Sequence, residues 1–145
     1  RSLVLIIEIK KHKNFASIVV FVDADNKILL LKRPNVKNLT YAGKWGFVGG
    51  GSEDYETPDE TAIREAAEET GLKVLPEDLI QIDKVESPDK RDVYVYACNK
   101  YEGIVRATDV KKEHDNYDWV SVDELDKFDK PDNSMMLIKK ALSVL

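Results

Sequence analysis

The sequence predicts an α/β fold in which a mixed β-sheet carries helices on both faces. Residues 16–22 form an almost wholly apolar run rich in β-branched side chains, which is typical of a buried strand. Residues 57–71 carry start and stop signals of a helix, and further strand-like and helix-like segments follow along the chain. Strands and helices that intermingle in this way favour a layered α/β domain.

The remaining elements follow in chain order. Residues 23–27 have the composition of a turn, so residues 28–31 are expected to return as the second strand of a hairpin. Pro34 and several asparagines mark a long loop before a short strand that ends in consecutive glycines. Later strands are expected at residues 80–85, 92–98 and 119–122, a short helix at 123–128, and an amphipathic helix at 134–145.

The helix in the middle of the chain has the clearest boundaries. Thr57 is followed by Pro58 and, three positions after the threonine, by Glu60, which together make a capping box with proline at the first helical position. Gly71 is a natural end, because glycine readily adopts the left-handed conformation that closes many helices.

Length and charge limit the functions that the chain can have. Its 145 residues are expected to form a single domain spanning 1–145. The net charge is −5 and the sequence pI is about 5.1, so long nucleic acid is not an expected partner. A small polyanionic substrate would need a few basic residues at its site, together with bound cations.

The single cysteine, Cys98, excludes an intramolecular disulfide and favours a cytoplasmic protein with a structural thiol. No apolar stretch has the length of a membrane span, and residues 1–10 lack the pattern of a signal peptide. The apolar side chains in residues 1–10 could instead pair across a homodimer.

Three glutamates on the central helix form the main candidate site. Glu65, Glu68 and Glu69 stand at i, i+3 and i+4, so their side chains converge on one face. Like charges so placed repel one another, and a bound cation removes that repulsion. Hard oxygen ligands suit Mg²⁺ or Mn²⁺. The alternative interpretation is a solvated acidic helix face.

Two neighbouring features support a site on this helix. Arg64 can pair with Glu56 in the loop before the cap, which would tie that loop to the helix. The glycines before the loop, beginning with Gly49, permit unusual backbone angles and leave a carbonyl free to face a metal.

The order of these residues resembles the signature of a known family. The segment runs Gly50, five residues, Glu56, seven residues, and then Arg64-Glu65-Ala66-Ala67-Glu68-Glu69-Thr70-Gly71-Leu72. It is similar to the Nudix box, Gly-x5-Glu-x7-Arg-Glu-U-x-Glu-Glu-x-Gly-U with U aliphatic, at every fixed position. Ala66 is a small choice for an aliphatic position, and Val48 stands where many members carry proline.

The resemblance implies the Nudix α/β/α sandwich and a hydrolase that acts on nucleoside diphosphates linked to another moiety. The implied cofactor is Mg²⁺, with Mn²⁺ as a substitute. The residues that match the family's metal ligands are Glu65, Glu68 and Glu69, together with the carbonyl of Gly49. Glu56 and Arg64 would be the supporting pair, and Glu65 is one candidate for the general base.

Further residues are expected near the site. Glu113 resembles the loop acid of mutator-type nucleoside triphosphatases, and Asp115 is a lesser candidate. His114 between them could be a base, although a lone histidine in a polar loop is more often exposed. Arg33, at the end of a predicted strand, is the candidate phosphate contact, against the alternative of a solvated charge.

Substrate identity stays open between several interpretations. Asn133 resembles the asparagine with which mutator-type enzymes bind a purine, but the favoured interpretation is that Asn133 or Ser134 caps the last helix. Pro88 lies sixteen residues after Leu72, as in some ADP-ribose-cleaving members. The short chain favours a nucleoside triphosphate pyrophosphohydrolase over an ADP-ribose or nucleotide-sugar pyrophosphatase. A non-catalytic nucleotide sensor is the alternative outside the enzymes, and RNA 5′-end processing lacks a basic stripe to support it.

Overall fold

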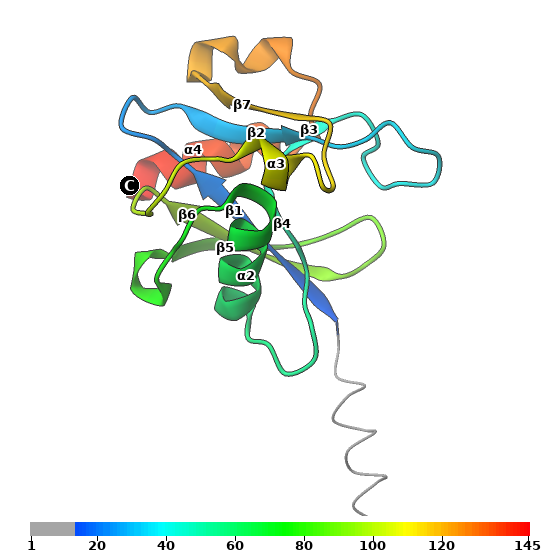
Figure 1. The fold of residues 1–145 in the computed structure, drawn as a ribbon, viewed down its shortest axis with the longest axis vertical. Helices are drawn as coiled ribbons and strands as arrows, with labels where there is room; N and C mark the ends of the chain where they lie inside the picture. The colour runs from blue at the N-terminus through cyan, green and yellow to red at the C-terminus, as the bar shows by residue number, and fades with distance from the viewer. Residues whose placement is uncertain (1–13) are drawn as a thin grey trace, which may run out of the picture.

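The strands of the protein form two sheets. The structure is a computed structural model that describes residues 14–145 (Figure 1). The four-stranded sheet has the order β4 (Val48–Gly51), β1 (Phe15–Phe21), β6 (Asp92–Cys98) and β5 (Ile80–Glu86). The three-stranded sheet has the order β3 (Trp45–Gly46), β2 (Ile28–Lys32) and β7 (Asn116–Val120). Only the β1–β6 pairing is parallel among these strands, so the four-stranded sheet is mixed.

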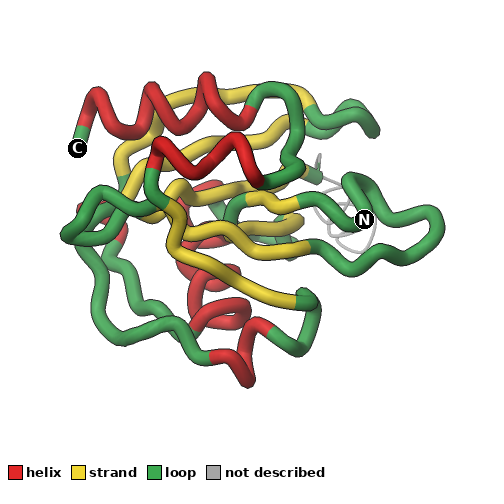
Figure 2. Tube along the Cα trace, turned by 90° about the horizontal axis from the view of Figure 1, so that it is seen from above, coloured by secondary structure: helices red, strands yellow, loops and turns green. Residues whose placement is uncertain are grey.

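Two helices cover opposite faces of the four-stranded sheet. Helix α2 (Pro58–Thr70) packs on β4 and β1, whereas α4 (Ser134–Val144) packs on β6 and β5. Figure 2 shows the C-terminal helix α4 running along one side of the strands. A single helical turn, α3 (Ala107–Val110), lies against α2. Two 3₁₀ segments, η1 (Pro76–Asp78) and η2 (Val122–Lys127), complete the described elements. The predicted α/β/α arrangement is confirmed.

The position of β1 between two helices explains why residues 16–22 do not alternate strictly between apolar and polar side chains. Along β1, Ala16 and Val20 face the core beneath α4, while Val19 and Phe21 face the core beneath α2. Because helices cover both faces, apolar residues are buried on both sides of the strand. Ser17 is the polar exception, and its hydroxyl donates a 2.7 Å hydrogen bond to the carbonyl of Pro58, which fixes the first turn of α2 on the sheet.

Several local predictions need correction. The turn at residues 23–27 does not close a hairpin, because β1 and β2 belong to different sheets and share only an isolated bridge between Val22 and Ile28. The strand expected at 119–122 begins earlier, as β7, and the short helix after it is a 3₁₀ segment. Helix α3 was not predicted, since four residues are too few for a periodic pattern.

Other expectations concern the thiol and the membrane. Cys98 is buried and free, its thiol lies 3.1 Å from the carbonyl of Lys100, and burial raises its pKa, as suits a structural role. Within residues 14–145, no helix has the length and apolar character that crossing a bilayer requires. The proposed dimer contact of residues 1–10 lies outside the described residues.

Candidate active site

Helix α2 begins and ends where its sequence signals place it. The backbone N–H of Glu60 donates to the Thr57 hydroxyl, and the carboxylate of Glu60 accepts from the backbone N–H of Thr57, so the capping box is complete. Gly71 ends the helix in the left-handed conformation with φ of 80°. These caps fix the rotation of the helix, and therefore the face on which its carboxylates lie.

The predicted pair of Glu56 and Arg64 is present and forms the centre of a network. Arg64 Nε lies 2.7 Å from Glu56 Oε2, and its Nη2 donates to the carbonyl of Gly51 at 2.9 Å. Glu56 Oε1 also accepts from the Thr61 hydroxyl and from the backbone N–H of Glu53. The loop before α2 is thereby tied to the helix at several points.

This network predicts a measurable dependence of stability on pH. Chiefly through the hydrogen bond from Arg64, the pKa of Glu56 falls from 4.5 to about 2. A depressed pKa stabilises the folded state above the unfolded value, and that contribution is lost as the pH falls from 4.5 towards 2. Glu56→Gln is expected to lower the free energy of unfolding by about 1–2 kcal/mol at pH 7, with allowance for solvent screening.

Chemical denaturation at pH 7, 4.5 and 3 checks this expectation. The difference between the parent chain and Glu56→Gln should shrink below pH 4.5. A difference that stays constant over this range would show that the Glu56 charge does not stabilise the fold.

The three candidate ligands on α2 occupy different environments. Glu65 and Glu69 are buried, with exposed fractions of 8% and 4%, whereas Glu68 is exposed. Arg64 Nη1 contacts Glu65 Oε1 at 3.0 Å and Glu68 Oε2 at 3.2 Å. The carboxylate of Glu69 instead accepts a 2.8 Å hydrogen bond from the backbone N–H of Gly49. Arg64 therefore holds two of the three carboxylates, and the third lies against β4.

The glycines of β4 leave the space that these carboxylates fill. A Cβ atom on Gly50 would lie 2.6 Å from the carboxyl carbon of Glu65. A Cβ on Gly49, where φ is 155°, would lie 2.2 Å from the backbone oxygen of Ser17. Any side chain at these two positions would move either β4 or the carboxylate.

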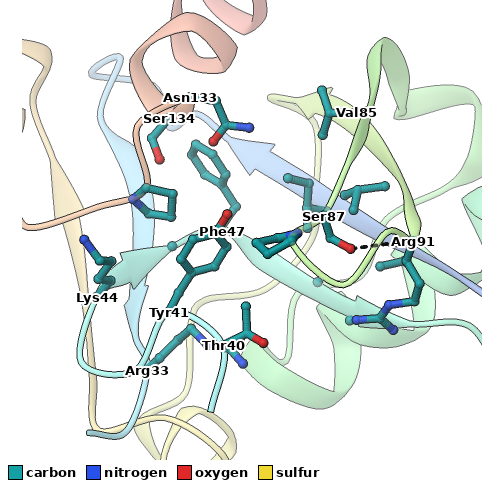
Figure 3. Close-up of a pocket in the computed structure, with 18 of the residues that line it drawn as sticks. Arg33, Thr40, Tyr41, Lys44, Phe47, Val85, Ser87, Arg91, Asn133 and Ser134 are labelled. Atoms are coloured by element: carbon teal, nitrogen blue, oxygen red, sulfur yellow. Dashed lines mark hydrogen bonds between the residues drawn. The ribbon is translucent and has the colours of Figure 1, made fainter. Parts of the chain in front are cut away.

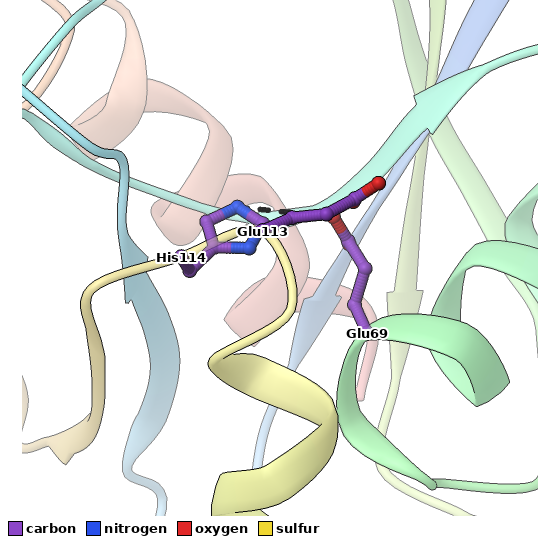
Figure 4. Close-up of side chains that lie close together, drawn as sticks. All are labelled: Glu69, Glu113 and His114. Atoms are coloured by element: carbon purple, nitrogen blue, oxygen red, sulfur yellow. Dashed lines mark ion pairs between the residues drawn. The ribbon is translucent and has the colours of Figure 1, made fainter. Parts of the chain in front are cut away.

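A second segment brings polar groups to the buried end of α2. The backbone N–H of Arg106 donates to the carbonyl of Thr70, and the Arg106 side chain pairs with Asp109 at 2.8 Å. The chain that follows α3 then carries Glu113 and His114 to Glu69, as Figure 4 shows. One ligand atom from each of these three residues lies within 4.8 Å of the others.

His114 corrects the prediction of an exposed histidine. Its side chain is 7% exposed, and its Nε2 lies 3.7 Å from Glu69 Oε2. Asp115 is exposed, and its backbone N–H donates to the carbonyl of Lys32, which anchors this segment to β2. A polar sequence around a histidine does not reveal that its neighbours fold over it, so no sequence signal could have located this imidazole.

Burial is the main cause of the pKa shifts of Glu69, His114 and Glu65. Desolvation raises the pKa of Glu69 to about 9, although the hydrogen bond from Gly49 opposes the shift. Burial, followed by the charge of Arg33, lowers the pKa of His114 to about 4. Burial also raises the pKa of Glu65. Such perturbed carboxylates beside a cavity are typical of a functional site.

The cavity beside these groups has a volume of about 420 Å³ (Figure 3). Gly49 and Gly50 lie at its lining together with His114, which connects the cavity to the carboxylate cluster. Its cationic lining residues are Arg33, Lys44 and Arg91. A protein with a net charge of −5 thus places positive side chains locally, as a polyanionic ligand requires.

Both predicted substrate contacts line this cavity. Arg33 follows β2, and its buried Nε has no hydrogen-bond partner among residues 14–145. Asn133 is the N-cap residue of α4, as the capping alternative expected, but its side chain makes no capping hydrogen bond. In Figure 3 the Asn133 amide extends towards the ring of Phe47, with Tyr41 beyond it.

Arg91 is a site residue that sequence analysis missed. It stands in the turn between β5 and β6, where its backbone N–H donates to the Ser87 hydroxyl at 3.0 Å. Its Nε lies 3.4 Å from Asp89 Oδ2 but forms no hydrogen bond within the described chain. Pro88 in the same turn also lines the cavity. The Ser-Pro-Asp turn signal marked this loop, but its position over the cavity depends on the pairing of β5 with β6.

Comparison with known proteins agrees with this architecture. The chain matches the NUDIX domain family over residues 12–138. An ADP-ribose pyrophosphatase from Methanocaldococcus jannaschii is 33% identical over 118 residues, which are 77% of this chain and 68% of that protein. An 8-oxo-dGTP diphosphatase from Proteus vulgaris is 32% identical over 80 residues, which are 55% of this chain and 70% of that protein.

Solved structures show the same fold. A MutT structure from work on Aliivibrio salmonicida and Vibrio cholerae superposes with a TM-score of 0.73 and 19% identity, covering 90% of this chain and 98% of that one. The Nudix domain of Shewanella oneidensis NrtR, in complex with ADP-ribose, gives a TM-score of 0.67 and 18% identity over 92% of this chain and 89% of that one. The family match over residues 12–138, with these relatives, shows that the chain belongs to the Nudix family and is a Nudix hydrolase.

Proposed function

We propose that this Nudix hydrolase splits a phosphoanhydride bond of a purine nucleoside triphosphate, releasing pyrophosphate. The observation that carries the proposal is the cavity whose lining joins the carboxylate end, at Gly49 and Gly50, to the free amide of Asn133. A nucleotide is arranged in the same way, with phosphates at one end and a hydrogen-bonding base at the other. The volume of about 420 Å³ lies in the usual range for small-molecule sites.

The carboxylate end suits a divalent cation. Nudix hydrolases generally use divalent metals such as Mg²⁺. We assign Mg²⁺, or Mn²⁺ in its place, to the carbonyl of Gly49 and the carboxylates of Glu65, Glu68 and Glu69. Buried carboxylates crowded beside a cavity are costly when ionised and lack enough donors to compensate, which favours a cation there. When bound, the metal would neutralise phosphate charge and lower the pKa of a water molecule.

The side chains around this end have separate roles in the proposal. Arg33 lines the cavity, where its guanidinium group would contact a phosphate. Glu65 or Glu113 would accept a proton from the attacking water. Arg64 keeps the carboxylates of Glu65 and Glu68 on one side of the helix through its ion pairs. Glu56 in turn fixes the orientation of that guanidinium.

The base end of the cavity predicts a selective effect of Asn133→Ala. Its amide can both donate to and accept from a purine, while Tyr41 and Phe47 offer aromatic surface. The variant is expected to lower kcat/KM for the preferred purine triphosphate by about 10–100-fold, and to change pyrimidine substrates little. Steady-state kinetics with both substrate types measures this selectivity, with Asp132→Ala as the neighbouring control. An equal loss for all bases would remove Asn133 from base recognition.

ADP-ribose is the second candidate substrate. The relative from Methanocaldococcus jannaschii is named an ADP-ribose pyrophosphatase. In this chain Arg91 and Pro88 line the cavity from the β5–β6 turn, where a guanidinium could contact a second ribose or phosphate. If ADP-ribose is the substrate, Arg91→Ala should raise its KM more than that of a nucleoside triphosphate.

The decisive experiment measures the products released from a panel of nucleotides, pyrophosphate and nucleoside monophosphates among them, by ion-exchange chromatography with Mg²⁺ and with chelator. The panel contains canonical and oxidised nucleoside triphosphates, ADP-ribose, nucleotide sugars, dinucleoside polyphosphates and capped RNA. Mg²⁺-dependent release from triphosphates alone would support the first proposal, and release from ADP-ribose the second. Nucleotide binding without any release would favour a sensor.

A further inference from the structure

The imidazole of His114 is buried beside the proposed Mg²⁺ ligands but has no role among them. Its side chain is 93% buried, yet Nδ1 has no hydrogen-bond partner within residues 14–145. Buried polar groups are nearly always hydrogen-bonded, because an unpaired one costs about 1–3 kcal/mol. The other nitrogen, Nε2, lies 3.7 Å from Glu69 Oε2, which is too long for a hydrogen bond.

The backbone fixes this ring on both sides. The N–H of His114 donates to the carbonyl of Val110 at 2.9 Å, and the N–H of the next residue, Asp115, donates to the carbonyl of Lys32 at 2.9 Å. The segment is therefore anchored to α3 on one side and to β2 on the other. The position of the imidazole near Glu69 follows from these anchors.

The spacing of the cluster fits metal coordination. With bonds of about 2.1 Å to a cation, two ligand atoms lie roughly 3.0 Å apart when adjacent and about 4.2 Å apart when opposite. The separation of 3.7 Å between His114 Nε2 and Glu69 Oε2 falls in this interval. Glu113 supplies the third ligand atom, and all three atoms lie within 4.8 Å of one another, slightly more than the roughly 4.2 Å of opposite ligands. The Glu113 side chain is exposed, so it is free to move towards a cation and leaves an entry path.

We propose that His114, Glu69 and Glu113 form a mixed nitrogen–oxygen site for a transition cation such as Mn²⁺, Co²⁺ or Zn²⁺. The site deepens the proposed function, on which it rests through the shared ligand Glu69, and adds a metal preference that an all-oxygen site lacks. Imidazole suits these ions much better than Mg²⁺, which prefers oxygen ligands and retains its water. The three residues come from α2 and from the segment after α3, so the site also joins these two parts of the fold.

A different use of the same imidazole is a contact with a substrate phosphate, since His114 also lines the cavity. The two uses predict different results in the absence of nucleotide. A ligand of a metal responds to the metal alone, whereas a phosphate contact responds only when nucleotide is added.

Nuclear magnetic resonance of the imidazole nitrogens tests the proposal without altering the site. The 145-residue chain has two histidines, so His12→Ala leaves His114 as its only imidazole. Titration with Zn²⁺ alone is expected to move the Nε2 resonance to the range of a metal-bound nitrogen, while Mg²⁺ leaves it nearly unchanged. An Nε2 resonance that stays in place at saturating Zn²⁺ would overturn the proposal, and a shift on nucleotide addition only would assign the phosphate contact.

Metal affinities give a second, independent test. For His114→Gln, calorimetry should show Co²⁺ and Mn²⁺ binding weakened at least about tenfold, and Mg²⁺ binding changed less than about twofold. Asp118→Asn, at an exposed position of β7, is the control and should match the parent. Equal losses for all three ions would mean that His114 only supports the fold.

These measurements remain informative if hydrolysis fails. Zn²⁺ binding at His114 without turnover would reject the enzyme proposal and keep the metal site. Mg²⁺-dependent turnover with an imidazole resonance that Zn²⁺ does not shift would keep the enzyme proposal and reject the metal site at His114.

Discussion

Replacement of Glu69 with glutamine is expected to lower kcat by about a thousandfold while leaving the fold intact. Glu69 is the carboxylate shared by the proposed Mg²⁺ set and by the cluster with His114, so the variant removes a negative ligand from both. Glutamine has nearly the same shape, and its amide oxygen can still accept the 2.8 Å hydrogen bond from the Gly49 N–H. Because burial opposes a charge at this position, the neutral side chain should not destabilise the protein.

Mg²⁺-dependent phosphate release and circular dichroism together measure this result. Glu77→Gln, an exposed glutamate in η1, is the control and should keep normal rates. Near-normal turnover in Glu69→Gln would remove Glu69 from the metal set. An unfolded variant would instead show that the carboxylate is structural.

Arg64→Lys is expected to cost about 2–4 kcal/mol of unfolding free energy and most of the activity. The guanidinium contacts Glu56 through two nitrogens, Gly51 through its carbonyl, and both Glu65 and Glu68. An ammonium group retains the charge but cannot reach these acceptors at once. Glu56 would then keep a poorly paired carboxylate in a half-enclosed position.

A double-mutant cycle with Glu56→Gln separates the pair from the rest of the network. If the Glu56–Arg64 contact carries the effect, the loss in the double variant should be clearly smaller than the sum of the single losses. Additive losses would mean that Arg64 acts through Glu65 and Glu68. Lys127→Arg, at the exposed ion pair with Glu124 in η2, is the control for exchanging an ammonium and a guanidinium group outside the network.

The local sequence predicted α2 and its network well, for physical reasons. Capping residues, proline and glycine act within a few positions, so Thr57, Pro58 and Gly71 determine the helix without the rest of the chain. The spacing of Glu56 and Arg64 along one loop and one helix likewise predicts their contact. Glu65, Glu68 and Glu69 share a helix, but their differing burial depends on how α2 sits on β4.

Features that depend on distant pairing could not be predicted in the same way. His114 is buried because the chain on either side of it is anchored to α3 and β2. Arg91 reaches the cavity because β5 and β6 are antiparallel neighbours with a turn at that edge. The hairpin expected after β1 failed because a turn signal does not specify which strands pair. The position of Asn133 at the start of α4 was predictable, but the absence of a side-chain cap hydrogen bond was not.

The parallel pairing of β1 with β6 has a consequence for how the chain folds. Phe15 pairs with Asp92 and Phe21 with Cys98, so β1, which has β4 as its nearer neighbour, gains its second partner only after residue 98 is available. Such long-range pairing slows folding, because the entropy of closing the intervening loop is lost before the contacts form. During synthesis β1 and β4, the strands on which α2 packs, become available first, but the four-stranded sheet is completed only after Cys98 leaves the ribosome. The segment that carries Glu113 and His114 to Glu69 follows Cys98 in the chain, so this cluster is complete only later still.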